Sequence, residues 1–78
     1  MYRELERAAL RDLKAARNSG IQPWIADYCA EQINRAKFYR ADAKRDAGIP
    51  GWYQNRFKKA CEVAAGVIDL LQAFRHAK

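Results

Sequence analysis

The sequence is poor in the side chains that most catalytic and metal sites need. Of its 78 residues, one is histidine, two are cysteine, one is serine and none is threonine. A structural zinc site needs four ligands, which His76, Cys29 and Cys61 cannot supply. Nucleophilic catalysis lacks its usual hydroxyl groups, and no glycine-rich loop is placed to hold a phosphate. We therefore expect no enzymatic activity, no metal site and no cofactor.

Long apolar runs are also missing. No stretch approaches the ~20 apolar residues that a membrane-spanning helix needs, and the first residues lack the apolar region of a signal peptide. We therefore expect a cytoplasmic protein without a membrane partner. The net charge of +6 favours acidic partners, such as nucleic acid or an anionic protein face.

A repeated pattern divides the chain into three segments. Residues 17–24 and 45–52 contain the same residue types in the same order: a basic residue, a glycine, an isoleucine, a proline and a tryptophan. Gly20 and Gly48 are predicted to end helices in the left-handed conformation of a Schellman motif, with the next isoleucine in apolar contact. Pro23 and Pro50 are predicted in the first turn of the next helix, where a missing N–H costs nothing.

The chain is predicted to be an all-α, antiparallel, up-down-up three-helix bundle that forms a single domain over residues 1–78. The helices are expected at about 2–19, 23–47 and 51–77, with short loops at Gly20–Gln22 and Gly48–Pro50. Short connections make successive helices antiparallel. Because the first helix is the shortest, one end of the hairpin formed by the other two should protrude.

Each predicted helix has an apolar seam with the spacing of a buried face. The expected seams are Tyr2, Leu5, Ala9, Leu13 and Ala16, then Ile25, Cys29, Ile33, Ala36, Ala43 and Ala47, then Tyr53, Phe57, Ala60, Ala64, Val67, Leu71 and Phe74. Val63, Ile68 and Leu70 widen the third seam, so this helix should pack against both others or against a second copy of the chain. Gly66 lies outside the seam and would permit a close backbone approach. Antiparallel pairing separates the two cysteines too far for a disulfide.

The second helix carries an unexpected aromatic residue on its polar side. Opposite its seam lie Trp24, Glu31, Arg35, Phe38, Asp42 and Arg45. This mixture of aromatic and charged groups is typical of protein-binding surfaces, with Phe38 and Trp24 as anchors. In the alternative interpretation this side is a solvated face with one stray phenylalanine, or the stems of the two arginines cover Phe38. Independently of Phe38, Trp24 and Trp52 could close opposite ends of the bundle, beside Phe74 and Tyr2 respectively.

A second candidate surface is basic. Arg3, Arg7, Arg11 and Lys14 form a ridge on the first helix, which Lys37, Arg40 and Lys44, or Arg56, Lys58 and Lys59, would extend. The ridge is either a solvated helix face or a site for the nucleic-acid backbone. Helices this long, joined by hairpin turns, argue against a helix-turn-helix.

The leading hypothesis is a small intracellular protein-binding module, either an adaptor or a steric inhibitor. Its expected partner is an acidic surface of a larger protein or nucleoprotein complex. The alternatives are a sequence-nonspecific nucleic-acid-binding bundle and a homodimeric structural subunit that associates through the third helix. The small size is also typical of proteins encoded by phages or mobile elements.

Overall fold

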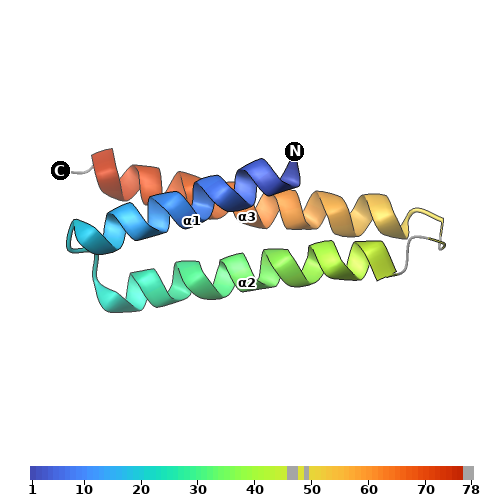
Figure 1. Ribbon diagram of the computed structural model, residues 1–78, viewed down its shortest axis with the longest axis horizontal. Coiled ribbons are helices and arrows are strands. Elements are labelled where there is room, and N and C mark those ends of the chain that lie inside the picture. The colour runs from blue at the N-terminus through green and yellow to red at the C-terminus, as the bar shows by residue number, and fades with distance from the viewer. Residues whose placement is uncertain (46–47, 49, 77–78) are drawn as a thin grey trace.

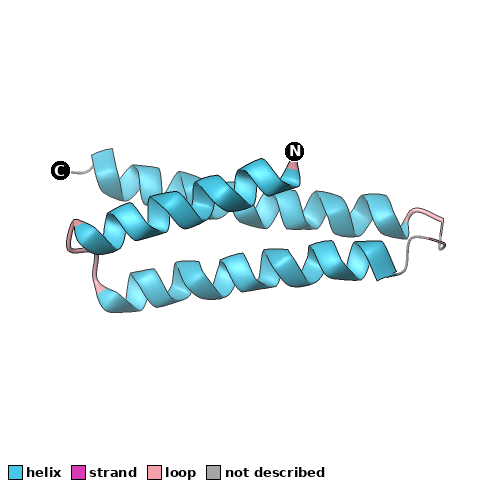
Figure 2. Ribbon diagram, viewed as in Figure 1, coloured by secondary structure: helices cyan, strands magenta, loops and turns pink. Residues whose placement is uncertain are grey.

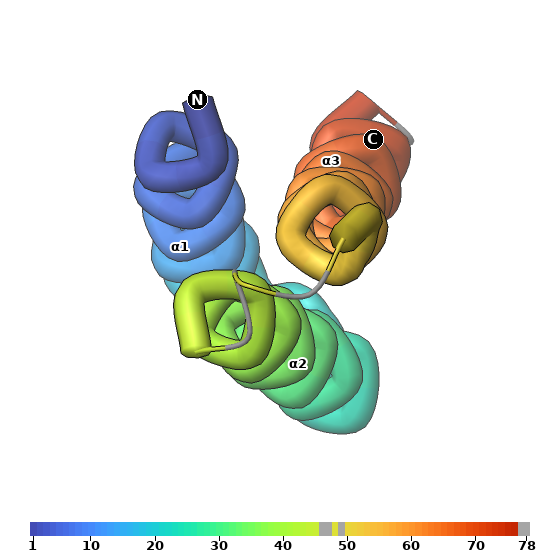
Figure 3. Tube along the Cα trace, turned by 90° about the vertical axis from the view of Figure 1, so that its right-hand side faces the viewer, coloured from blue at the N-terminus to red at the C-terminus, as the bar shows by residue number. Residues whose placement is uncertain are grey.

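The chain folds into three packed helices. The computed structural model describes residues 1–45, 48 and 50–76, in which the elements are α1 (Tyr2–Asn18), α2 (Pro23–Arg45) and α3 (Trp52–His76), with no strand among them. Successive helices run antiparallel (Figures 1 and 2), and every pair of helices is in contact. Seen along the bundle, the helices stand at the corners of a triangle (Figure 3). The predicted all-α three-helix bundle is confirmed.

The first turn is the Schellman motif that the sequence predicts. Gly20 has a left-handed backbone with φ of 87°, and its N–H donates to the carbonyl of Arg17 at 3.4 Å. The N–H of Ile21 donates a hydrogen bond to the carbonyl of Ala16 at 3.0 Å. The side chains of Ile21 and Ala16 are buried in the same apolar cluster. α2 then begins at Pro23, as predicted.

The second turn differs from the prediction. The proline was expected inside the first turn of the third helix, but α3 begins at Trp52, so Pro50 precedes it. Gly51 has the left-handed backbone here, with φ of 78°, and its carbonyl accepts the first helical hydrogen bond from Asn55 N–H at 3.1 Å. The Schellman motif predicted at Gly48 involves residues 47 and 49, which lie outside the described residues.

Most of the predicted seams are buried. The described part of the core consists of Tyr2, Ala9, Leu13, Ala16, Ile21, Ala26, Cys29, Ile33, Ala36, Ala43, Ala60, Ala64, Val67 and Leu71. Seven further predicted or widening positions are only half-buried, namely Leu5, Ile25, Tyr53, Phe57, Val63, Ile68 and Phe74, and Ala47 lies outside the described residues. α3 packs against both other helices, as expected.

The predicted packing holds for the two cysteines but fails at Leu70 and Gly66. Leu70 does not widen the core, because its side chain is 41% exposed. A side chain at Gly66 would meet no atom within 4 Å, so the expected close backbone approach is wrong. Cys29 is buried and Cys61 half-buried, and both are free thiols, which confirms that they form no disulfide.

The helices differ in length, and this difference shapes one end of the molecule. α1 has 17 residues, whereas α2 and α3 have 23 and 25. The α2–α3 hairpin therefore extends past the N-terminus of α1 (Figure 1), in a molecule measuring 45 × 18 × 14 Å. In the described part of the chain, no helix has the length and apolar character needed to cross a membrane.

Candidate interaction surfaces

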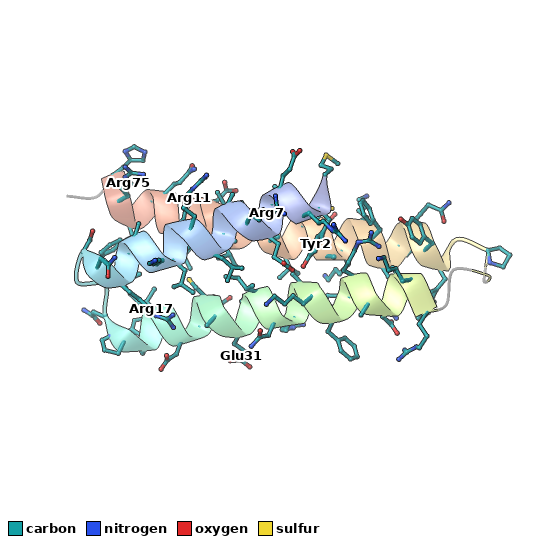
Figure 4. The ribbon with its side chains drawn as sticks, in the orientation of Figure 1. Tyr2, Arg7, Arg11, Arg17, Glu31 and Arg75 are labelled. Carbon is teal, nitrogen blue, oxygen red and sulfur yellow. The ribbon has the colours of Figure 1, made fainter. Side chains whose placement is uncertain are left out.

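One face of α2 carries large aromatic side chains that nothing in the bundle covers. Trp24 is 69% exposed, Phe38 63% and Tyr28 50%. We call these three residues, together with Glu31 and Arg35, the aromatic face. Figure 4 shows Glu31 pointing away from α1 and α3. The exposure of Phe38 contradicts the interpretation in which arginine stems cover its ring, and Trp24 does not close the end of the bundle.

The aromatic face has the spacing of a helix-packing seam. Its residues follow one another at alternating steps of four and three positions along α2. This is the heptad spacing that keeps side chains on one stripe facing a neighbouring helix. Tyr28 belongs to this stripe, although it is not among the interface residues predicted from the sequence. Its position four residues after Trp24 was the signal that could have identified it.

Hydrogen bonds fix several side chains of the aromatic face. The indole Nε1 of Trp24 donates to Gln22 Oε1 at 2.6 Å. Arg35 Nη2 donates to the hydroxyl of Tyr39 at 3.3 Å, which raises the pKa of Arg35 and lowers the pKa of Tyr39. The ring of Tyr39 meets Phe38 edge-on, with ring centroids 6.4 Å apart. The arginine and the exposed phenylalanine are therefore both braced by one tyrosine.

Asp42 does not belong to this exposed surface, contrary to the expectation from the helical repeat. It is only 8% exposed, and its carboxylate pairs with Arg45 of α2 and with Arg56 Nε of α3, the latter at 3.5 Å. Asp42 therefore joins α2 to α3. Arg45 remains exposed, but its guanidinium binds Asp42 at the far end of the helix from Trp24.

Arginine and aromatic side chains pack together on the half of the α2–α3 hairpin nearest its turn. Arg56 lies 4.2 Å above the centre of the Trp52 ring, and Arg40 lies 5.1 Å above the centre of Phe57. Phe57 also stacks on Tyr53, with ring centroids 5.7 Å apart. These contacts supply both apolar area and cation–π attraction, and Phe57 also packs against the cluster that includes Tyr2 of α1. Trp52 and Arg56 are therefore half-buried structural residues.

The basic ridge predicted on α1 is exposed. Arg3, Arg7, Arg11 and Lys14 all face solvent, and Figure 4 shows Arg7 and Arg11 along α1. Arg11 pairs with the neighbouring Asp12 at 3.7 Å.

The structure brings one end of this ridge together with three cations of α2. Arg3 lines a hollow of about 270 Å³ with Lys37, Arg40 and Lys44, which we call the basic hollow. Lys58 and Lys59 are exposed on α3 and do not line it.

Comparison with protein-family models, with curated proteins and with solved structures returns no match for this chain. Within residues 1–45, 48 and 50–76, no group of three or more His, Cys, Asp or Glu side chains is placed to hold a metal ion. The two surfaces are therefore interpreted from their geometry and charge alone.

Proposed function

We propose that this protein is a protein-binding module that uses the aromatic face of α2. The observation that supports the proposal is the exposure of Trp24, Tyr28 and Phe38 on one stripe of one helix. Aromatic side chains that are exposed in the free protein contribute favourable free energy of binding when a partner buries them. Tryptophan, tyrosine and arginine are also the residues that most often dominate binding energies at interfaces.

The spacing of the aromatic face suits a helical partner. Trp24 and Phe38 are fourteen residues apart, which corresponds to about 21 Å along a helix. An amphipathic helix binds its partner by laying its apolar face into a hydrophobic groove, or by pairing with another helix in a coiled coil. The partner surface should therefore offer two apolar sites about 20 Å apart, with acidic groups between them to meet Arg35. The net charge of +6 would favour encounter with such an acidic surface.

The experiment is affinity capture from cells of the source organism, followed by binding measurements on the captured partner. We expect wild-type protein to retain a partner that the Phe38→Ala and Trp24→Ala variants lose. Truncating a dominant interface residue costs at least about 2 kcal/mol, so the Phe38→Ala variant should bind the purified partner roughly 30-fold more weakly. Leu10→Ala is the matched control, because Leu10 is a similarly exposed apolar residue on α1.

Two results would contradict the proposal. If both aromatic variants bind the purified partner as tightly as wild type while circular dichroism shows an intact fold, another surface is used. If sedimentation shows a homodimer that Phe38→Ala dissociates, the aromatic face binds a second copy of the chain, and no separate partner is needed. A dimer that survives this substitution would instead favour association through α3.

A further inference from the structure

The basic hollow gathers positive charge from two helices around one recess. It lies between the first turns of α1 and the second half of α2, and its lining is Tyr2, Arg3, Glu6, Lys37, Arg40, Ala41 and Lys44. Four of these residues are cationic and one is acidic. The Glu6 carboxylate accepts a hydrogen bond from the Tyr2 hydroxyl at 2.8 Å, so one of its oxygen atoms already has a donor. The hollow is far larger than the ~30 Å³ share of one water molecule, and its lining favours an anion.

Arg40 has no anionic partner among the described residues. Its Nη1 atom is buried and has no hydrogen-bond acceptor, and no carboxylate among the described residues forms an ion pair with it. A buried donor without an acceptor costs about 1–3 kcal/mol, and more when the group is charged. The ring of Phe57 offsets only part of this cost. An anion in the hollow would supply the missing charge close to this guanidinium.

The start of α1 adds to the positive potential. Tyr2 and Arg3 belong to its first turn and line the hollow. The N-cap residue Met1 makes no side-chain hydrogen bond to this turn. The first backbone N–H groups of a helix carry about half a positive charge between them and favour phosphate groups nearby.

The ridge on α1 continues from the hollow as a line of cations. Arg3, Arg7, Arg11 and Lys14 extend over about 16 Å, and helical residues four apart are about 6 Å from one another. A line of this kind matches a chain of phosphates better than a compact anion. We propose that the basic hollow binds one phosphate of a nucleic-acid backbone and that the α1 ridge binds the phosphates that follow it.

This site and the aromatic face are separate surfaces. Lys37 and Phe38 are adjacent in sequence, so their side chains leave α2 about 100° apart. Lys37 lines the hollow with Lys44, whereas Phe38 belongs to the outward stripe with Trp24. The ligand at the hollow would be bound by charge without base recognition, because Tyr2 in its lining is buried and the aromatic side chains exposed enough to stack on a base, Trp24, Tyr28 and Phe38, lie on the other surface. Loss of either surface should leave the other functional.

The test compares two double variants that remove the same charge. Lys37→Ala with Lys44→Ala changes the hollow, and Lys58→Ala with Lys59→Ala changes α3. All four lysines are exposed on helices, so alanine should preserve the fold, which circular dichroism would check. Fluorescence anisotropy would measure the binding of labelled single-stranded and duplex DNA between 50 and 200 mM salt. Inorganic polyphosphate of similar charge would be the third ligand.

For wild type we expect log K against log salt to have a slope of about −3 on single strands, as four phosphate contacts predict, one at the hollow and three along the ridge. The hollow variant should reduce this slope by about 0.7, because the hollow holds one phosphate, and the α3 variant should leave it unchanged. Arg3→Glu provides a second test, because an acidic residue in the first turn of α1 preserves the helix but repels phosphate. Absence of DNA binding at 50 mM salt, or an equal loss in both double variants, would overturn the proposal. Polyphosphate that binds more tightly than DNA at equal charge would overturn the assignment of this site to nucleic acid.

Discussion

The same substitution, glycine to alanine, should have opposite effects at Gly20 and Gly66. Gly20 has φ of 87°, a conformation that costs an L-residue about 1–2 kcal/mol. An added Cβ there would meet no atom within 4 Å, so the cost comes from the backbone alone. Alanine also restricts the unfolded chain, which returns about 0.5 kcal/mol. We therefore expect Gly20→Ala to lower the free energy of unfolding by about 1 kcal/mol.

Gly66 lies within α3, where its side chain would also meet open space. Alanine has the higher helix propensity by about 1 kcal/mol, so Gly66→Ala should raise the free energy of unfolding by about that amount. The two variants should then differ by about 2 kcal/mol. For a domain of this size each kcal/mol shifts Tm by about 4–8 °C.

Thermal and urea unfolding followed by circular dichroism would measure both variants. Gly51→Ala should behave like Gly20→Ala, because Gly51 also has a left-handed backbone, with φ of 78°. The reasoning is refuted if Gly20→Ala leaves Tm unchanged, or if Gly66→Ala lowers it. The second result would mean that α3 has a neighbour at Gly66 that the isolated bundle lacks.

Three other predictions concern the surfaces and the core. Phe38→Ala should change the free energy of unfolding by less than about 0.5 kcal/mol, whereas Ile33→Ala in the core should lower it by about 2–5 kcal/mol in urea titrations. Burial, reinforced by a hydrogen bond, raises the pKa of Tyr2 above its ordinary value of about 10. The protonated Tyr2 hydroxyl therefore contributes its full share of the free energy of unfolding below about pH 10. At higher pH the unfolded chain loses this proton before the folded chain does, so the contribution declines. Tyr2→Phe removes the titrating hydroxyl, and the free energy of unfolding should then fall less steeply at high pH. Arg40→Met should keep the free energy of unfolding within about 1 kcal/mol of wild type, because an apolar side chain needs no acceptor. The same variant should weaken DNA binding. A fall in the free energy of unfolding of more than about 3 kcal/mol would show that the guanidinium is structural.

The helices and the first turn were predictable because their signals are local. A Schellman motif depends on residues a few positions apart, so Gly20, Ile21 and Pro23 identify it without knowledge of the rest of the fold. The seams of the three helices follow in the same way from the spacing of apolar residues. At the second turn nothing in the sequence indicated that Gly51 takes the left-handed conformation directly before α3, and the motif predicted at Gly48 rests on residues 47 and 49, outside the described part of the chain.

The positions that the sequence misplaced depend on contacts between helices. The helical repeat puts Asp42 on the polar side of α2, and only the position of Arg56 on α3 explains why it is buried. Tyr28 lies at the border of the seam, where its exposure depends on how closely α3 approaches. Arg40 has the sequence signature of a solvated cation, yet the start of α1 and the ring of Phe57 enclose part of its guanidinium.

The short first helix links the two unusual features of this bundle. Because α1 begins beside the second half of α2, the turn end of the hairpin extends beyond it, and there arginine and aromatic side chains pack together. The same starting point places the first turn of α1 against Lys37, Arg40 and Lys44 and so forms the basic hollow. An apolar residue at position 40 would cover Phe57 without leaving a buried donor unpaired. Arginine there is easier to explain if its charge is used by a ligand, since stability alone does not require it.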